Sequence, residues 1–372
     1  MAMFENLYIH VPFCTAKCGY CAFYSLPQAG LSPMEHYLEA MERELEEFSR
    51  GETLDTLYFG GGTPTVLPLP LLENLLAAVS SSYRITPQTE VTMECNPETL
   101  SPVYIDILRS IVNRVSMGVQ TFSPRLRKIL SRRGTGEEAE HAIQLLRRGG
   151  IENISLDLIY AIPGQTLNDW ESDLRRAAET GVNHMSCYSL TLEPGTPLAQ
   201  ELGEHAIDEE LSAEMWQAAG EFLSDFGLER YEVSNYAVPH WECRHNMNVW
   251  HGHSYLGLGP AASSFNGLAR WTEPANLEQW LSGAAPIRDE LTPSARAREV
   301  FAFGLRTVTG WRREQWEELP RRLIAGRSWE KLLNSEAVDK LQTRGLLDVT
   351  ADQIRPTEKG IAFWNDVAEE LI

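Results

Sequence analysis

Short β-rich runs alternate with longer amphipathic stretches through the first part of the chain. The hydrophobic and β-branched positions predict strands at residues 7–10, 56–59, 90–94, 114–118, 153–157 and 184–190. The amphipathic stretches predict helices at residues 33–50, 70–81, 102–112, 137–148, 167–180 and 209–226. Strands that are each followed by a helix predict a parallel α/β sheet with right-handed crossovers. Six such units fit either a partial barrel or an open doubly wound sheet.

Candidate functional residues follow the carboxyl ends of these predicted strands. The first strand runs into a loop with three cysteines, the second into residues 60–62 (GGG), and the third into Glu94. Gln120 follows the fourth strand and Asp157 the fifth. In parallel α/β folds, ligands and chemistry gather beyond the carboxyl ends of the strands. These residues therefore predict one shared active site.

The pattern changes beyond residue 230. Residues 231–280 are rich in aromatic, His and Gly residues and are expected to be irregular, whereas a helical pattern resumes after Pro293. Residues 338–371 predict a helix, two strands and a helix, which is typical of a small winged-helix-like module. We therefore expect three parts, at residues 1–230, 231–290 (a connecting segment that closes the cavity) and 291–372.

Charge and hydropathy narrow the classes of function. The chain has 32 basic and 52 acidic side chains, and its net charge of −20 repels nucleic acid and anionic lipid, so neither is an expected partner. From Ser294 onward basic and acidic residues are equal in number, which marks a separate C-terminal domain. No stretch is apolar enough to insert into a membrane, and the first residues lack the pattern of a secretion signal. We expect a cytoplasmic protein.

Three of the six cysteines are closely spaced. Cys14, Cys18 and Cys21 form a C-x3-C-x2-C loop directly after the first predicted strand. Three thiolates can hold three irons of a [4Fe–4S] cluster and leave the fourth iron open to a substrate or cofactor. A structural zinc site favours four ligands in paired spacing, and the other cysteines are isolated. The loop therefore favours an iron–sulfur cluster over structural zinc or unpaired thiols.

A C-x3-C-x2-C loop after a first strand resembles the signature of radical S-adenosylmethionine (SAM) enzymes. Five motifs resemble the oxygen-independent coproporphyrinogen III oxidase group of porphyrin biosynthesis, and within it a haem-chaperone branch. They are YIHVPFC at residues 8–14, FGGGTPT at 59–65, ECNP at 94–97, MGVQ at 117–120 and DLIYAIPGQ at 157–165. The resemblance covers most of the chain. It implies a partial (β/α)6 barrel, similar to an incomplete TIM barrel, with a small C-terminal α+β domain of the type found in that group.

The resemblance also implies which residues bind the cofactors. The ligands of a [4Fe–4S] cluster would be Cys14, Cys18 and Cys21. SAM would be held by the open iron and by Tyr8, Gly61, Gly62, Thr63 and Glu94. The inner cavity, where relatives can hold a second SAM, would be lined by Tyr20, Gln120, Arg132, Asp157 and Thr191. The residues alone are equally consistent with a helix cap at Asp157 and a surface ion pair at Arg132.

Residues 245–250 (HNMNVW) resemble a His-Asn-x-x-Tyr-Trp element of the haem-chaperone branch that is linked to haem binding. The resemblance implies His245 as an axial ligand of haem iron, with Cys243 as the alternative through its thiolate. Val249 stands where the element has Tyr. The residues alone are equally consistent with a hydrogen-bonded His245 in an aromatic cluster.

Three functions remain open at this point. The first is a haem chaperone that binds SAM on a cluster and delivers haem to acceptor haemoproteins, with an electron donor and a second copy of the chain as further implied partners. The second is a radical enzyme that cleaves SAM reductively, either a coproporphyrinogen III dehydrogenase or a two-SAM methyltransferase. Phe23 disfavours the dehydrogenase, because relatives with that activity have Cys there. The third is a non-catalytic metal-binding scaffold, which the intact SAM motifs disfavour.

Overall fold

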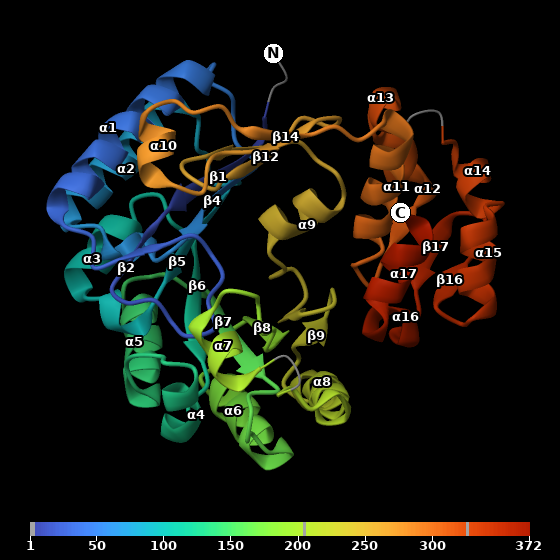
Figure 1. Ribbon diagram of the computed structural model, residues 1–372, viewed down its shortest axis with the longest axis horizontal. Coiled ribbons are helices and arrows are strands. Elements are labelled where there is room, and N and C mark those ends of the chain that lie inside the picture. Colours follow the sequence, from blue (N-terminus) through green and yellow to red (C-terminus); the bar gives the residue numbers. More distant parts are fainter. Residues whose placement is uncertain (1–3, 204–205, 325–326) are drawn as a thin grey trace.

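A parallel sheet organises the first part of the computed structural model, which describes residues 4–203, 206–324 and 327–372 (Figure 1). Six parallel strands lie side by side in chain order: β1 (Asn6–Val11), β4 (Thr56–Gly61), β5 (Glu90–Cys95), β6 (Arg114–Gln120), β7 (Asn153–Tyr160) and β8 (His184–Ser189). All six predicted strands are confirmed. The order of the strands is the parallel α/β arrangement that the sequence predicts.

Helices connect these strands and cover one face of the sheet. The long ones are α1 (Leu31–Phe48), α2 (Leu69–Ser82), α3 (Pro102–Leu108), α5 (Gly136–Arg148), α6 (Leu167–Glu179) and α8 (Glu209–Ser224). Two shorter helices are α4 (Pro124–Ile129) and α7 (Pro197–Leu202). Figure 1 shows α1, α2, α3 and α5 along the outer side of the molecule. The predicted helices are confirmed, although α3 ends at Leu108 rather than at residue 112.

Residues 231–280 are more ordered than the sequence predicts. They contain β10 (Asn235–Ala237), α9 (Arg244–Trp250), β11 (Tyr255–Leu258), β12 (Ser263–Phe265), β13 (Arg270–Thr272) and α10 (Leu277–Leu281). With β9 (Glu229–Arg230) and β14 (Ile287–Asp289), these strands extend the sheet to 12 strands. The expectation of irregular structure is wrong because such short strands show no alternation. Their order comes from pairing within the sheet: β11 pairs with β1, β10 pairs with β8, and β12 and β13 continue from β11.

The two faces of the parallel strands differ in chemistry, because successive side chains in a strand point to opposite faces. The face under the helices is apolar, with buried Leu7, Ile9, Leu57, Phe59, Val91, Met93, Val115, Met117, Ile154 and Leu156. Polar side chains pair across the other face, in Asn6–Thr56, Tyr58–Glu94, Ser116–Asp157 and Ser155–His184. Parallel sheets are normally apolar on both faces, so this inner polar face indicates a ligand cavity.

The C-terminal part has a hydrophobic core of its own, which includes Trp311, Trp316 and Trp329. Its elements are α11 (Pro293–Gly304), β15 (Trp311–Arg312), α12 (Arg313–Glu318), α13 (Arg321–Ile324), α14 (Trp329–Leu333), α15 (Glu336–Thr343), β16 (Leu347–Val349), β17 (Gln353–Pro356), α16 (Glu358–Ala362) and α17 (Trp364–Leu371). Figure 1 shows this lobe on the α9 side of the sheet. The predicted final helix is interrupted, because Phe363 has a non-helical backbone with φ −108° and ψ 37°.

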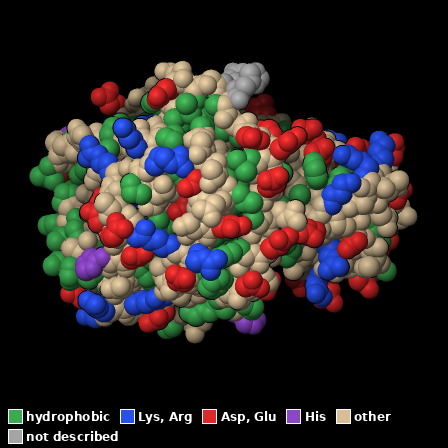
Figure 2. Space-filling view, turned by 90° about the horizontal axis from the view of Figure 1, so that it is seen from below, with side chains coloured by type: hydrophobic (Ala, Val, Ile, Leu, Met, Phe, Trp, Pro, Cys, Tyr) green, Lys and Arg blue, Asp and Glu red, His purple; other side chains and the backbone are tan. Residues whose placement is uncertain are grey.

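Acidic and basic side chains are intermingled on the face that Figure 2 shows, over both the sheet part and the C-terminal lobe. None of the helices within the described ranges combines the length and the apolar character needed to cross a bilayer.

Glu44 ties α1 to the segment that follows β11. Its carboxylate accepts hydrogen bonds from the Gly259 backbone N–H at 3.0 Å and from Trp280 Nε1 at 2.9 Å. Burial raises the pKa of Glu44 from its ordinary value of 4.5 to about 7. At a pH between these two pKa values, Glu44 keeps its proton in the folded protein but has lost it in the unfolded chain. The contribution of Glu44 to stability therefore falls as pH rises through that window.

We expect Glu44→Gln to remove this pH dependence, which amounts to no more than about 3 kcal/mol for a shift of this size. The measurement is the free energy of unfolding by urea at pH 5 and at pH 8, compared between the variant and the wild type at each pH. Glu39→Gln, on an exposed position of the same helix, is the control. A difference from the wild type that is identical at both pH values would contradict the prediction.

Candidate cluster and cofactor site

The cysteine loop leaves the carboxyl end of β1 and is closed by a small pair of strands. Cys14 ends β2 (Phe13–Cys14), which pairs in parallel with β3 (Leu26–Pro27). Cys18 and Cys21 lie in the loop between these two strands. All three thiols are free and partly buried. The loop therefore presents three sulfur atoms on one short, anchored segment.

A chain of polar side chains connects two of these thiols. Thr63 Oγ1 lies 3.7 Å from Cys14 Sγ and accepts a hydrogen bond from Asn96 Nδ2 at 3.0 Å. Arg132 donates from Nη2 to Asn96 Oδ1 at 2.6 Å and from Nη1 to Cys18 Sγ at 3.6 Å. The guanidinium thus places a positive charge beside a sulfur that must be a thiolate to bind iron.

Asn96 is the member of this chain that the sequence reasoning missed. The sequence predicts roles for Thr63 and Arg132 but none for the residue that joins them. A signal was available, because Asn96 belongs to the ECNP motif at residues 94–97. Arg132 is not a surface ion pair. Its side chain is largely buried, and it also donates to the carbonyl of Gly118.

The glycines at the end of β4 allow two backbone segments to approach closely. A Cβ on Gly62 would lie 2.5 Å from the carbonyl oxygen of Phe13, and one on Gly61 would lie 2.6 Å from the ring of His10. Gly61 also has a φ of +108°, which favours glycine. These residues hold the end of β4 against the start of the cysteine loop.

Two partly buried carboxyl groups lie on the inner face of the sheet. Glu94 accepts a hydrogen bond from the Tyr58 hydroxyl at 2.9 Å, and Asp157 accepts one from Ser116 Oγ at 3.2 Å. Burial raises the pKa of Glu94 to about 7, and the charge of Asp157 adds to this effect. Burial also raises the pKa of Asp157. Asp157 lies within β7 rather than at the start of a helix, so it is not a helix cap.

The other expected inner-cavity residues lie around the cysteine end of the sheet. Gln120 ends β6 with a φ of +70°, and its Nε2 and Arg132 Nη2 flank Gly118. Tyr20 lies in the cysteine loop, and burial raises its pKa above the ordinary value. Thr191 is exposed after β8, and no hydrogen bond joins it to these residues within the described chain.

A pocket of about 410 Å³ opens on the inner face. Its walls are mostly aromatic and consist of Tyr8, His10, Phe23, Tyr24, Tyr58, Glu94, His245, Asn246, Val249, Trp250, Tyr255, Ala261 and Ser263. The pocket joins two of the expected SAM contacts, Tyr8 and Glu94, with the expected haem ligand His245. Aromatic walls with a few polar groups suit a flat conjugated ligand.

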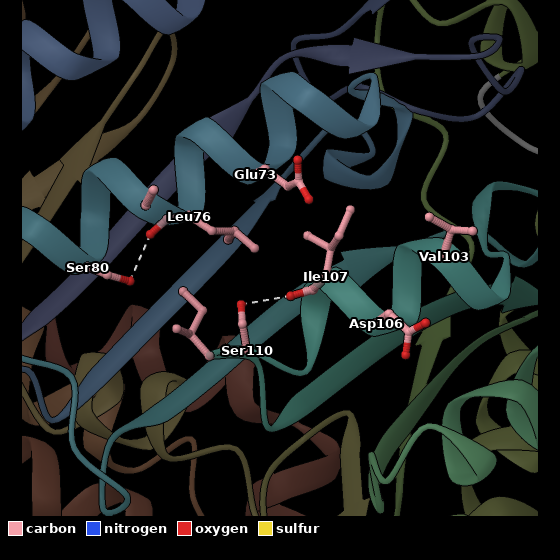
Figure 3. A pocket seen from close by; sticks show the side chains of 9 residues that line it. Glu73, Leu76, Ser80, Val103, Asp106, Ile107 and Ser110 are labelled. Carbon is pink, nitrogen blue, oxygen red and sulfur yellow. Dashed lines mark hydrogen bonds between the residues drawn. The ribbon is translucent and has the colours of Figure 1, made fainter.

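A second hollow, of about 600 Å³, lies in the outer helix layer between α2 and α3. Figure 3 shows the side chains of Leu76 and Ile107 between the two helices, with Glu73 and Asp106 beside them. Neither the cysteines of the loop nor the inner carboxyl groups line this hollow. The candidate site is therefore the inner pocket.

His245 lies at the opposite end of the strands from the cysteine loop. Its Nδ1 forms a 2.7 Å hydrogen bond with Oγ1 of Thr56, the first residue of β4. Its backbone N–H donates to Glu90, the first residue of β5, at 2.9 Å. The ring lies 5.1 Å from that of Tyr58. Burial, assisted by the positive charge of Arg114, lowers the pKa of His245 to about 3, so the imidazole is neutral.

Cys243 has different surroundings. Its side chain is fully buried before α9, with Sγ 3.7 Å from Glu90 Oε1, and it does not line the pocket. Burial raises the pKa of Cys243 to about 12, so its sulfur is a protonated thiol at neutral pH.

Known proteins resemble this chain over nearly its whole length. Residues 8–177 match the radical SAM superfamily. A protein of Lactococcus lactis named "Heme chaperone HemW" is 34% identical over 99% of this chain and 97% of its own length. Its namesake in Synechocystis is 36% identical over 84% of this chain and 80% of its own length.

A solved structure agrees with these matches. Coproporphyrinogen III oxidase (HemN) from Escherichia coli, described as a radical SAM enzyme, superposes with a TM-score of 0.82 at 24% identity, over 98% of this chain and 89% of that one. The cysteine loop and the fold define a radical SAM protein. Within that class, the chain belongs to the HemW family.

The radical SAM family implies a [4Fe–4S] cluster and SAM, and the cysteine loop fits the cluster. Among the described residues no three His, Cys, Asp or Glu side chains converge on one metal ion. Cysteines that hold a cluster each bind a different iron, so they need not converge. When bound, the cluster and SAM supply an electron and a carbon radical. Burial raises the pKa of Cys14 and Cys21, so iron binding there releases protons.

We expect Cys14→Ala, Cys18→Ala and Cys21→Ala each to abolish the cluster, because each removes the ligand of one iron. Iron and sulfide analysis after anaerobic reconstitution measures this loss. Cys95→Ala and Cys187→Ala, which remove buried thiols elsewhere in the sheet, are the controls. Full iron content in any of the three loop variants would contradict the ligand assignment.

Asn96→Ala should weaken the cluster without removing a ligand, because the amide links Thr63 to Arg132. Changes in such supporting residues typically cost about 10-fold or more in metal affinity. The rate at which a chelator bleaches the cluster absorbance measures the effect. Asn113→Ala, directly before β6 at the amino end of the sheet, is the control, since within the described chain its side chain bonds to the backbone of Val91 and Thr89. Equal bleaching rates in the two variants would refute a role for Asn96.

Proposed function

We propose that this protein is a haem chaperone, which binds haem in the aromatic pocket through His245 and delivers it to acceptor haemoproteins. The observation that carries the proposal is that His245 lines the same pocket as Tyr8 and Glu94. The name "Heme chaperone HemW" of the relatives supports it. A second copy of the chain and an electron donor are the further partners that we propose.

The state of His245 suits an iron ligand. Its Nδ1 is engaged by Thr56, whereas its Nε2 makes no hydrogen bond with the described part of the chain. A neutral imidazole with one such nitrogen coordinates haem iron. Because the pKa of His245 is about 3, protons do not compete with iron near neutral pH. Cys243 is the weaker candidate, since its thiol is protonated and lies outside the pocket.

We also propose how the chain holds its other cofactors. Cys14, Cys18 and Cys21 hold the cluster, with Arg132 next to Cys18. SAM lies between the cluster and the inner face, where its contacts are Tyr8, Gly61, Gly62, Thr63 and Glu94. The inner-cavity set of Tyr20, Gln120, Asp157 and Thr191 continues beyond it. Residues 1–230 thus carry the cluster, 231–290 supply His245 and close the pocket, and 291–372 form a separate lobe.

A radical enzyme that cleaves SAM is the second candidate function. A network of hydrogen-bonded side chains favours this function, because it supports a cluster site. The network runs from Cys14 through Thr63, Asn96 and Arg132 to Cys18. Phe23 argues against a porphyrinogen dehydrogenase. Release of methionine and 5′-deoxyadenosine under reducing conditions, with a product formed in proportion, would identify such an enzyme.

The test of the haem proposal is an anaerobic haem titration of the reconstituted protein, followed by absorbance with and without SAM. We expect stoichiometric uptake, and at least 10-fold weaker binding in His245→Ala because the iron loses its axial ligand. Cys243→Ala should bind haem normally. His251→Ala is a matched control, since His251 is also buried but bonds to the carbonyls of Met247 and Gly310. Unchanged affinity in His245→Ala would reject the ligand assignment.

A further inference from the structure

Among the residues that the structure describes, no Lys or Arg lines the aromatic pocket, and Glu94 is the acidic residue of its walls. Haem carries two propionate carboxylates on one edge and apolar substituents on the opposite edge. A buried carboxylate with no positive charge beside it is disfavoured, even where neutral donors such as Tyr24 and Asn246 line the pocket. The absence of a basic wall residue therefore favours a haem whose propionate edge lies at the mouth.

Phe23 and Lys17 lie together in the cysteine loop. The side chain of Phe23 lines the pocket, yet the residue is 72% exposed. Lys17 is exposed as well, and its Nζ donates a hydrogen bond to the carbonyl oxygen of Phe23 at 3.3 Å. Because the Phe23 ring both lines the pocket and reaches solvent, it lies at the pocket mouth. The same loop thus offers an apolar ring and a cation side by side.

We propose that haem enters with its propionate edge outward, where Lys17 pairs with a propionate and the Phe23 ring covers part of the macrocycle. This inference rests on the proposed haem function and adds the orientation of the ligand and its two contacts at the mouth. Phe23 acts through apolar burial, which does not depend on the charge of the ligand. Lys17 acts through charge, which disappears when the propionates are neutral. The two contributions are therefore separable.

The experiment compares haem with haem dimethyl ester, whose propionates carry no charge. Both ligands are titrated into the reconstituted full-length wild type, Lys17→Gln and Phe23→Ala. We expect Lys17→Gln to weaken haem binding about 2- to 5-fold, as for an exposed ion pair, and to leave the ester unchanged. Phe23→Ala should weaken both ligands about 10-fold or more, and Phe23→Trp should restore both.

Two matched controls lie in the C-terminal lobe. Lys359→Gln removes a lysine whose Nζ also donates to a backbone carbonyl, that of Arg344, at 3.3 Å. Phe363→Ala removes a phenylalanine that is 52% exposed. Neither variant should change the binding of either ligand.

Each outcome decides one part of the inference. Equal effects of Lys17→Gln on haem and ester, or no effect on haem, would overturn the outward orientation. Unchanged binding in Phe23→Ala would overturn the role of the ring. If the Lys17→Gln protein loses iron, both ligands are titrated into the wild type at low and high salt instead. The affinity for haem should fall as salt rises, whereas the affinity for the uncharged ester should not. Failure of wild-type protein to bind haem through His245 would instead reject the proposed function itself.

Discussion

The polar inner face of the six parallel strands is the constraint that shapes this molecule. Helices cover the apolar face, so the other face has to satisfy its buried polar groups by side-chain pairs or by ligands. The pairs Tyr58–Glu94 and Ser116–Asp157 do part of this. The cysteine loop closes one end of the strands and α9 the other. The pocket exists because its walls cannot collapse into an apolar core.

The inner face favours ligand groups that carry a positive charge. Burial disfavours the charged forms of Glu94 and Asp157, so a ligand group with positive charge is stabilised beside them and a negative one is not. The sulfonium and amino groups of SAM meet this requirement. Under the proposed function, haem would face these groups with its apolar edge and its iron.

Most of the sheet could be predicted from the sequence, because the six strands are separated by long helices with clear periodicity. The cysteine loop, Glu94, Gln120 and Asp157 could be placed at one end for the same reason, whereas Arg132 was implied only by the family resemblance. Residues 231–280 could not, since strands as short as β12 and β13 become ordered only by pairing with neighbours. Asn96 was missed because its importance arises from two side chains that are distant in sequence.

The anchoring of α9 has a consequence for how cargo leaves the protein. His245 is held by Thr56 through its ring and by Glu90 through its backbone, both at the rigid amino ends of strands. These two hydrogen bonds fix the position of the imidazole in the pocket. Under the proposed function, handover requires the iron–nitrogen bond to break inside the pocket. The rate at which that bond breaks, rather than a motion of the donor, would then limit the speed of delivery.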